Sequence, residues 1–550
     1  MKKRDWVFLF GFLAVFLIYL YKIPLEIQGN DEAFYLTIPQ RILQGDVFVV
    51  DEWHGSQLYT FLLVPLRWLR DLFCPDTNGI VLQYRWFYLA FHSLVCLGLY
   101  GLIRPYGLSG ALAALALYLF TPYDIPALCY NVIGLDMMAL TTAMLTAGKK
   151  WDFPAGLCFA WAVLCTPHLL LVYGLFSLGV LLLGGRTGRL RLLTFTGGCA
   201  LLAAGLIGFI LLRTDLKTFL ASVPALFTDP EHPPVSLGLK ISLFFRSFAR
   251  WQWQLICYGG LLLAAALDRG RRKRTALYLG LAGAVMLWML IPCLPELLRR
   301  DYHAIIFPMA LLGPMALLLA KKRDRNLARW FLLGGLGYMF CIHLASNQQG
   351  YLICAMSLIP GLGGILLTGR LIGQTAPGWN RAGCRTAAAI LAAAQIFLMG
   401  YTKVNHKFWS FSENRELTVT IADGPYAGIR VTPRTEAAYT RELAQVRRAL
   451  EGREGTVLLA TKKVWYHLVC PKLQNGAFSA WLSGETDTTV YRLASYYEGN
   501  PEKRPDWIYL PPGGKWNMDC FSRELLEGYS KVEGLPMYMR VEAPAPEQKN

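Results

Sequence analysis

The sequence has little charge for its length. Only 17% of its 550 residues are Asp, Glu, Lys or Arg, whereas 54% are hydrophobic, and the mean hydropathy is +0.35. Soluble domains carry about 25% charged residues, so a chain of soluble domains is excluded. One helical crossing of a bilayer takes about 20 apolar residues, and apolar runs recur as far as Lys403. The composition therefore predicts an integral membrane protein with no nucleic-acid partner.

The sequence also lacks several motifs. No two of the 13 cysteines have Cys-x-x-Cys spacing, so zinc and thiol-redox motifs are absent. Most cysteines lie in or beside apolar runs, where Cys behaves as a small hydrophobic residue; a Cys470–Cys520 disulfide is left open. There is no Asn-x-Ser/Thr sequon and no C-terminal retention signal. Both absences favour a bacterial plasma membrane over a eukaryotic endomembrane without excluding the latter.

Thirteen segments have the apolar character of membrane spans. They cover 6–23, 83–103, 107–121, 134–148, 153–166, 168–184, 192–213, 252–267, 276–294, 303–320, 328–345, 351–369 and 386–402. The first run is long and ends without a small-residue cleavage site, so we expect a signal anchor that is also the first span rather than a cleaved signal peptide. The sequence thus predicts a polytopic α-helical membrane protein of about 13 transmembrane helices.

The excess of +17 charges is distributed unevenly along the chain. If the N-terminal Met-Lys-Lys-Arg is inside, the inner segments carry runs of bases but only four acids, Asp5, Asp152, Asp268 and Asp324. Cytoplasmic loops are enriched in Lys and Arg. We therefore expect a multi-pass plasma-membrane protein whose N-terminus is cytoplasmic and whose C-terminal domain is extracytoplasmic.

Three outward segments are too long to be simple connections. The segments 24–82 and 214–251 contain amphipathic stretches with aromatic residues and bases, which is typical of helices lying in the interface plane. The segment 403–550 has a soluble composition and follows the predicted membrane domain, 1–402. It contains a hairpin signal over 417–432, an amphipathic helix over 435–450 and short apolar strands at 456–460 and 507–510. A small extracytoplasmic α/β domain is expected there.

Acidic residues mark the first candidate site on the outer side. Asp31 and Glu32 follow the first span at the start of a predicted helix, where acids also stabilise the helix N-terminus; both interpretations stay open. Asp136 lies two residues inside the fourth predicted span, where a carboxylate is costly. An acid in that position is expected to be functional or paired.

Histidines and bases form a second signal. Four histidines and five bases fall on predicted outward loops or outer span ends: His54, His168, His303, His343, Lys240, Arg246, Arg250, Arg299 and Arg300. A cationic layer at headgroup level suits a lipid phosphate or pyrophosphate, because Arg and Lys pair with phosphate oxygens. The alternative is a rim of side chains that snorkel around the helix ends.

The order of these motifs resembles a known family. A first span is followed by Asn-Asp-Glu-Ala-Phe-Tyr at 30–35, Arg-Ile-Leu-Gln-Gly-Asp at 41–46 and Trp-His-Gly-Ser-Gln-Leu-Tyr at 53–59. Later come Gly-Leu-Asp-Met at 134–137, Thr-Pro-His at 166–168 and Arg-Arg-Asp-Tyr-His at 299–303. Over residues 1 to about 400 the chain resembles GT-C superfamily glycosyltransferases, in particular the branch of protein O-mannosyltransferases and lipid A aminoarabinose transferase.

The resemblance implies transfer of a sugar from a polyprenyl-phosphate carrier to an acceptor on the outer face. Asp31, with Glu32 beside it, falls on the acid of the external loop, which acts as general base with inversion at the anomeric carbon. Asp136 falls on a second acid that orients acceptor or sugar. The candidates for binding the donor phosphate are Arg299, Arg300, Tyr302, His303, His54 and His168. His54 and Ser56-Gln57-Leu58 replace the aminoarabinose-type Lys and Pro-Pro-Leu pattern, which points to a different donor sugar.

Neither a metal nor a cofactor is expected, because the leaving group already carries phosphate. The acceptor is a lipid, glycopolymer or protein. Two other classes fit the residues alone: a flippase or transporter of a lipid-linked sugar, and a non-catalytic envelope scaffold. Transporters usually show internal repeats and ionisable groups near the midplane, and neither is evident, so the sequence favours the glycosyltransferase.

Overall fold

The computed structural model describes residues 2–227, 235–298, 300–346, 351–407, 410, 412–482, 487–512 and 528–541. The chain divides into two compact units. The helical unit contains residues 1–23, 85–205 and 235–413, and the mixed unit contains residues 24–84, 206–234 and 414–550. The predicted boundary at residue 403 stays a prediction. Residues 24–82, which are predicted to be external and are called the first external segment below, lie in the same compact unit as the C-terminal residues.

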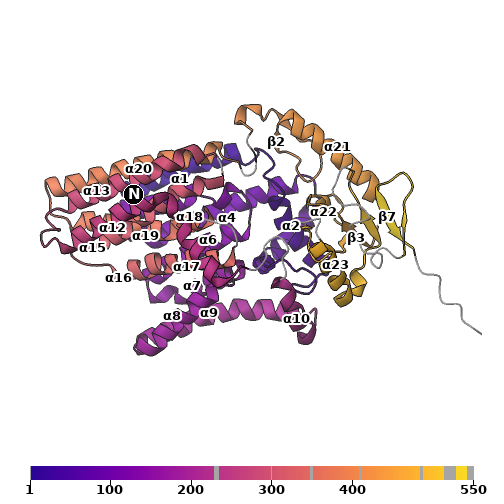
Figure 1. Ribbon diagram of the computed structural model, residues 1–550, viewed down its shortest axis with the longest axis horizontal. Helices are drawn as coiled ribbons and strands as arrows, with labels where there is room; N and C mark the ends of the chain where they lie inside the picture. Colours follow the sequence, from indigo (N-terminus) through magenta and orange to yellow (C-terminus); the bar gives the residue numbers. More distant parts are fainter. Residues whose placement is uncertain are drawn as a thin grey trace, which may run out of the picture. The chain divides into compact units, whose positions relative to one another are not determined.

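The helical unit is built from helices that range from single turns to long apolar helices (Figure 1). They are α1 (Lys3–Lys22), α4 (Ile80–Ile103), α5 (Leu108–Leu119), α6 (Tyr130–Ala147), α7 (Asp152–Cys165), α8 (Leu169–Leu183), α9 (Arg186–Leu211), α11 (Leu237–Arg246), α12 (Gln252–Leu267), α13 (Thr275–Leu290), α14 (Phe307–Ala310), α15 (Leu312–Leu319), α16 (Arg325–Leu327), α17 (Gly334–Ala345), α18 (Tyr351–Met356), α19 (Leu358–Gln374) and α20 (Trp379–Asn405). The first residues of α4 and the last of α9 belong to the mixed unit.

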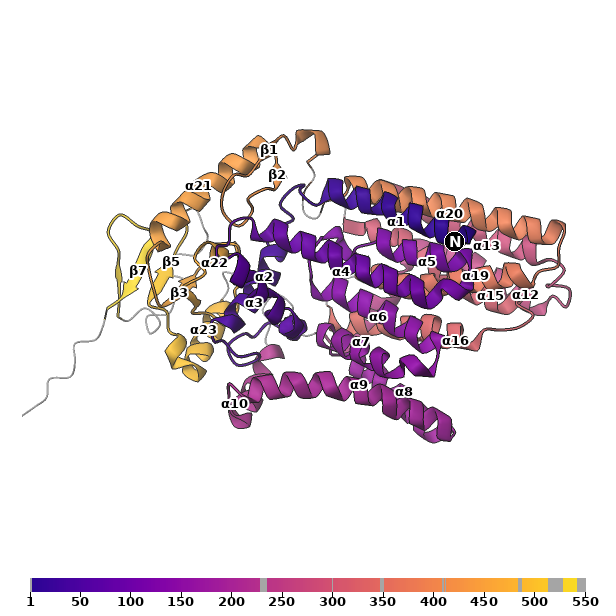
Figure 2. The ribbon, with the colours of Figure 1, turned by 180° about the vertical axis from the view of Figure 1, so that it is seen from behind.

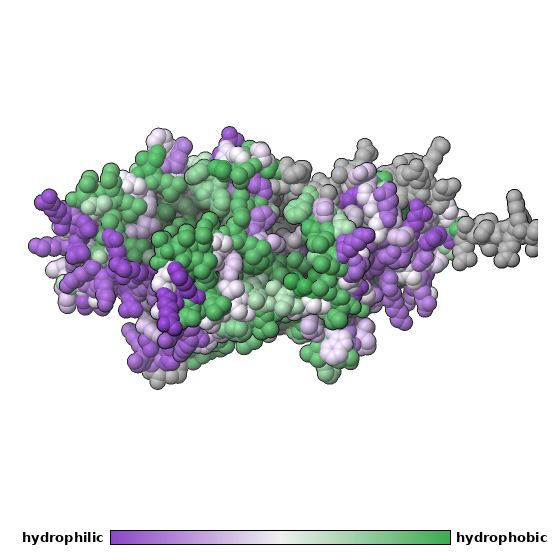
Figure 3. Space-filling model, turned by 90° about the horizontal axis from the view of Figure 1, so that it is seen from below, coloured by the Kyte–Doolittle hydropathy of each residue, from purple (hydrophilic) through white to green (hydrophobic). Residues whose placement is uncertain are grey.

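Each predicted span falls on helical residues of this series. In the described part of the chain, seven helices are long and apolar enough to cross a membrane, and shorter apolar helices accompany them. The protein is therefore a multi-pass membrane protein, while the count of thirteen spans stays a prediction. Apolar side chains cover the flank of the helical unit and hydrophilic side chains gather at one of its ends (Figure 3). The α12–α13 connection, with Arg271, Arg272 and Lys273, lies at the corresponding end in Figure 1.

The first and last long helices of this unit are neighbours. α1 and α20 run side by side in both views (Figures 1 and 2). Many α1 side chains are exposed and apolar, such as Phe10 and Leu17, as expected where a helix faces lipid. Its side-chain polar contacts include those of Asp5 in its first turn and those of Tyr19 and Lys22 in its last turn.

Among the described residues, the mixed unit has seven strands, of which two form one sheet and five form another. The strands are β1 (Val419–Thr420), β2 (Arg430–Val431), β3 (Thr456–Leu459), β4 (Gln474–Asn475), β5 (Trp507–Tyr509), β6 (Tyr529–Lys531) and β7 (Met537–Arg540). β1 and β2 form an antiparallel pair, and the other strands have the order β4-β3-β5-β7-β6, with β3 parallel to β4 and β5. The predicted hairpin, the two buried strands and the α/β character are confirmed.

The helices of the mixed unit come from all three of its chain segments. They are α2 (Asp31–Leu43), α3 (Val64–Phe73), α10 (Leu216–Ser222), α21 (Pro433–Leu450), α22 (Tyr466–Val469) and α23 (Asp487–Gly499). Trp53 of the first external segment packs with Phe478 and Tyr496 in one hydrophobic cluster. Its backbone N–H also donates to the Phe478 carbonyl at 2.7 Å. The external segment is therefore part of the core of this unit.

The two predicted helices of the first external segment differ in burial. α2 is buried from Glu32 to Ile42, whereas α3 exposes Trp68 and Phe73. Of these two helices, α3 presents the exposed apolar surface expected of a helix in the interface plane. The proposed disulfide falls outside the described residues, because Cys520 is not among them.

Candidate functional site

Asp31 is the first residue of α2 and differs in exposure from the residues that follow it. Its side chain is half-buried, while each residue from Glu32 to Ile42 is buried. Asp31 therefore combines a rigid position with a partly open face. A general base requires both, because it must meet the acceptor in one fixed geometry.

Glu32 has a different environment. It is only 2% exposed, and its Oε2 accepts a hydrogen bond from the Gln28 N–H at 3.3 Å. This carboxylate satisfies a backbone donor close to the start of α2, as acids at helix N-termini do. Of the predicted pair, Asp31 is the more accessible acid.

His54 lies against the first turn of α2. Its ring makes an edge contact with Phe34, with ring centroids 4.7 Å apart, and Trp481 makes a similar contact with Phe34 at 5.8 Å. Phe34 is three positions after Asp31, so the two residues share a helix face. His54 Nδ1 accepts from the Ser56 N–H at 3.2 Å. His54 and Trp481 thus border the helix face on which Asp31 lies.

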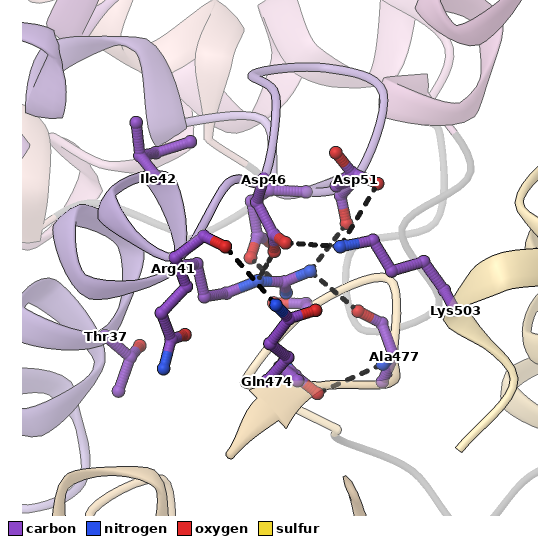
Figure 4. Close-up of polar contacts among 12 residues, drawn as sticks. Thr37, Arg41, Ile42, Asp46, Asp51, Gln474, Ala477 and Lys503 are labelled. Carbon is purple, nitrogen blue, oxygen red and sulfur yellow. Dashed lines mark hydrogen bonds and ion pairs between the residues drawn. The ribbon is translucent and has the colours of Figure 1, made fainter. Parts of the chain in front are cut away.

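Arg41, on the same helix, is the centre of a buried network (Figure 4). Its guanidinium donates to Asp46 at 2.5 Å, to Glu52 at 2.8 Å and to the Ala477 carbonyl at 3.0 Å. A further bond reaches the Asp51 carbonyl at 2.8 Å. Bonds to both the external segment and residue 477 fix α2 against the C-terminal part of the mixed unit.

Lys503 adds a second cation to this network. Its Nζ lies 2.5 Å from Asp46 and 3.7 Å from Asp51. Three acids thus face two bases. Burial and the neighbouring Asp46 raise the pKa of Asp51, and burial raises the pKa of Glu52 although Arg41 opposes the shift.

Asp136, on α6 in the helical unit, is paired. His92 of α4 places Nδ1 2.8 Å from the Asp136 carboxylate, and both side chains are almost completely buried. His92 Nε2 lies 3.2 Å from the Tyr118 carbonyl. Asp136 is therefore paired, which is one of the two outcomes expected for an acid inside a span. The part of Asp136 in catalysis stays a prediction.

The polar chain continues from Tyr118 towards the α1 and α20 ends. Tyr19 donates to the Tyr118 carbonyl at 2.9 Å and contacts the Thr121 hydroxyl at 3.0 Å. Lys403 Nζ then donates to Thr121 at 2.5 Å and to Asp124 at 2.7 Å. Asp124 also pairs with Lys22. Hydrogen bonds and ion pairs thus connect the surroundings of Asp136 to α1, through Tyr19 and Lys22, and to α20, through Lys403.

His303 contacts the loop that contains Asp124. Residues 122–124 form the short helix η3 (Pro122–Asp124), in which Tyr123 and Asp124 have left-handed φ values of 56° and 58°. Such values are uncommon for residues other than glycine and cost free energy. The Tyr123 N–H donates to His303 Nε2 at 2.7 Å. An accepting ring nitrogen carries no proton, so this nitrogen is not a donor here.

His168 and His343 form a separate group with Lys240. His343 Nε2 donates to the Lys240 carbonyl at 2.5 Å, and the Lys240 ammonium donates to the Leu344 carbonyl. His168 is exposed and within electrostatic reach of Lys240. Of the predicted cationic layer, His343 and Lys240 thus contact each other, while His303 is buried and contacts Tyr123.

Three further phosphate-binding candidates are Arg299, Arg300 and Tyr302. Arg299 falls outside the described residues, and only the backbone of Arg300 and Tyr302 is described, within the short helix η8 (Arg300–Ile306). Their predicted role stays a prediction.

Two solved structures resemble this fold. One is the archaeal oligosaccharyltransferase AglB from Archaeoglobus fulgidus in complex with an inhibitory peptide and a dolichol-phosphate, at 12% identity and a TM-score of 0.43, covering 92% of this chain and 70% of that chain. The other is the Archaeoglobus fulgidus oligosaccharyltransferase tethered to an acceptor peptide containing the NVT sequon, with the same identity and TM-score, covering 92% and 69%.

The O-mannosyltransferase and aminoarabinose branch, which the sequence motifs resemble, stays a prediction. Likeness this distant assigns no activity to the chain. No family model and no curated protein sequence matches it.

Sequence reasoning missed His92, Arg41 and Asp124. His92 carried a signal, since it is a histidine within the second predicted span. Asp124 lies in a short connection between two spans, where a polar residue is unremarkable. Its partners, Lys22 and Lys403, are about 100 and 280 positions away, so no local pattern reveals the pairing.

Proposed function

We propose that this protein is a glycosyltransferase that moves a sugar from a polyprenyl-phosphate carrier to a cell-envelope acceptor on the outer face of the membrane. The observation that carries the proposal is the half-buried Asp31 at the start of an otherwise buried helix that Arg41 fixes in place. The motif order around it adds the resemblance to GT-C enzymes. In this proposal the basic connections are cytoplasmic and the mixed unit is extracytoplasmic.

The reaction needs one proton transfer and one displacement. Asp31 takes the proton from an acceptor hydroxyl as its oxygen forms a bond to the anomeric carbon. The bond from that carbon to the phosphate oxygen breaks, and its electron pair leaves with polyprenyl phosphate, so the configuration inverts. Arg299, Arg300, Tyr302 and His303, with His54 and His168, are the groups we propose for binding the donor phosphate.

Asp136 has a supporting role in this proposal. Its partner His92 and the burial of both side chains hold it in one geometry. It then orients acceptor or sugar through the packing around it, and Glu32 supports the start of α2 beside the base.

The decisive test is Asp31→Asn in cells that otherwise lack the protein. Polyprenyl-phosphate sugars in lipid extracts are measured by mass spectrometry at equal protein abundance, with Asp76→Asn as matched control. Asp76 is an exposed acid of the same external segment. We expect one lipid-linked sugar to accumulate with Asp31→Asn only, and the transfer rate to fall by about 10²- to 10⁴-fold. Unchanged lipid-linked pools beside an active wild type would overturn the proposal.

One observation favours the alternative of a lipid-linked-sugar flippase. The buried Asp136–His92 pair and the chain through Tyr19, Thr121 and Lys403 resemble the acid and histidine chains of proton relays. A flippase driven by proton transfer along these residues requires Asp136 and does not require Asp31. The Asp31→Asn experiment therefore separates the two classes.

A further inference from the structure

Helix α3 has an arrangement opposite to that of an ordinary surface helix. Its exposed side is apolar, with Trp68 at 55%, Leu72 at 60% and Phe73 at 79% exposure. Its buried side contains two arginines, Arg67 at 2% and Arg70 at 5%. Apolar side chains outward and charges inward are expected where a helix faces lipid rather than water.

The position of α3 in the chain agrees with a location at the membrane surface. α3 ends at Phe73, and a helix that qualifies as a membrane span begins at Ile80. Arg70 Nε donates to Gln83 Oε1 at 2.8 Å, and Gln83 is in the first turn of that span. Arg70 thus contacts the first turn of that helix, and the ends of a membrane-spanning helix are where side chains meet lipid headgroups.

The two guanidinium groups are close together and incompletely satisfied. Both bind Asp71, Arg67 at 2.7 Å and Arg70 at 3.0 Å, and Arg67 also donates to Gln40 at 3.2 Å. Arg67 Nη1 and Arg70 Nη2 are buried and have no hydrogen-bond partner among the described residues. Buried donors without partners are costly.

The charge of this group is also unbalanced. Two cations share one acid, and the Asp71 side chain is 32% exposed while the arginine side chains are 3% exposed. The Tyr84 hydroxyl lies within electrostatic reach of both arginines. A tetrahedral anion with several acceptor oxygens matches two adjacent guanidinium groups.

We propose that Arg67 and Arg70 bind the phosphate group of a membrane lipid whose chain lies along the apolar side of α3. This site is separate from the phosphate that leaves in the proposed reaction. Gln40, which contacts Arg67, is nine positions after Asp31 on α2, or about 13 Å along the helix axis. The donor phosphate is bonded to the carbon that reacts, so it needs to lie closer to Asp31 than this separation along α2.

The test measures lipid binding rather than transfer. Full-length protein in neutral detergent is titrated with polyprenyl phosphate, with phosphatidylglycerol and with inorganic phosphate, and binding is followed by native mass spectrometry. We expect one or both lipids to bind wild-type protein and Arg67→Gln/Arg70→Gln to weaken that binding at least about tenfold. Which lipid binds identifies the source of the phosphate. Equal affinity for inorganic phosphate would contradict a lipid site.

Two further variants make the result independent of folding defects. Arg213→Gln removes an arginine of the same unit whose Nη1 donates to the Ile42 and Asp46 carbonyls, and it should leave lipid affinity unchanged. Asp71→Asn removes the competing carboxylate and should raise affinity about two- to fivefold. Unchanged or weaker binding by Asp71→Asn would overturn the proposal. So would a double variant that holds as many lipid molecules as the wild type, because the donor site of the proposed reaction is intact in both proteins and only the lipid at Arg67 and Arg70 should be lost. Asp31→Asn should bind lipid here as the wild type does, so failure of this site and failure of the proposed reaction are distinguishable.

Discussion

The helical unit and the mixed unit each contain a buried ion network, and the two networks have opposite charge balance. In the helical unit, one acid, Asp124, pairs with Lys22 and Lys403. In the mixed unit, Asp46, Asp51 and Glu52 surround Arg41 and Lys503. Both networks join segments that are remote in sequence.

The difference matters because the cost of a buried charge depends on its partners. Asp124 is the acid that both lysines share, so neutralising it leaves two buried cations without their acid. Asp51 is one of three acids around two bases, so neutralising it removes a surplus charge. The same substitution, Asp to Asn, is therefore expected to have opposite consequences in the two units.

The largest effect is expected at Asp124. Asp124→Asn should lower the free energy of unfolding by about 3–5 kcal/mol, because it strands Lys22 and Lys403 and releases a loop with left-handed residues. Unfolding in denaturing detergent measures it. The control is Asp423→Asn, which breaks the exposed Arg447 pair and should cost about 1 kcal/mol or less. Equal costs for the two variants would contradict the central role of Asp124.

A smaller effect is expected at the other buried pair of the helical unit. In a double-mutant cycle with His92→Ala and Asp136→Ala, the coupling in the free energy of unfolding should be about 1–3 kcal/mol. The two side chains contact each other at 2.8 Å, so each single variant leaves a buried polar group without that partner. Additive single effects would mean that the pair does not stabilise the unit.

The smallest effect is expected at Asp51, and it depends on pH. Because its folded pKa is raised from the ordinary 3.8, the folded state holds the proton more tightly than the unfolded state. Stability therefore falls as pH rises from about 3.8 through the raised pKa. Asp51→Asn removes that loss, so its stability relative to wild type should improve by about 1 kcal/mol as pH rises. Thermal unfolding followed by tryptophan fluorescence measures it, and relative improvement on acidification would contradict it.

Much of the local structure was predictable from the sequence. The apolar runs coincide with helices because a run of about 20 apolar residues has few other stable states in a membrane. The strands at 456–459 and 507–509 and the helix ending at Leu450 follow from their patterns. Burial of α2 was not predictable, because its periodic apolar face also fits a surface helix, and its buried polar side is explained only by the partners of Arg41.

The candidate site was predictable in part. Asp31 and Glu32 share one motif, but the structure leaves Asp31 half-buried and gives Glu32 a backbone donor. Arg67 and Arg70 interrupt an apolar stretch in the sequence, which indicates an interfacial helix but not that both arginines point inward. Their orientation depends on Gln40 and Gln83, which belong to other helices.

The sequence by itself determined the membrane character, the positions of the helices and the small α/β region, because these depend on hydropathy and on periodicity over neighbouring residues. Only the tertiary structure decided the partners of the buried charges. Lys22 meets Asp124, Arg41 meets the Ala477 carbonyl, and His92 meets Asp136. A charge in a low-dielectric interior must find its partner wherever the fold brings one close, and chain distance places no limit on that choice.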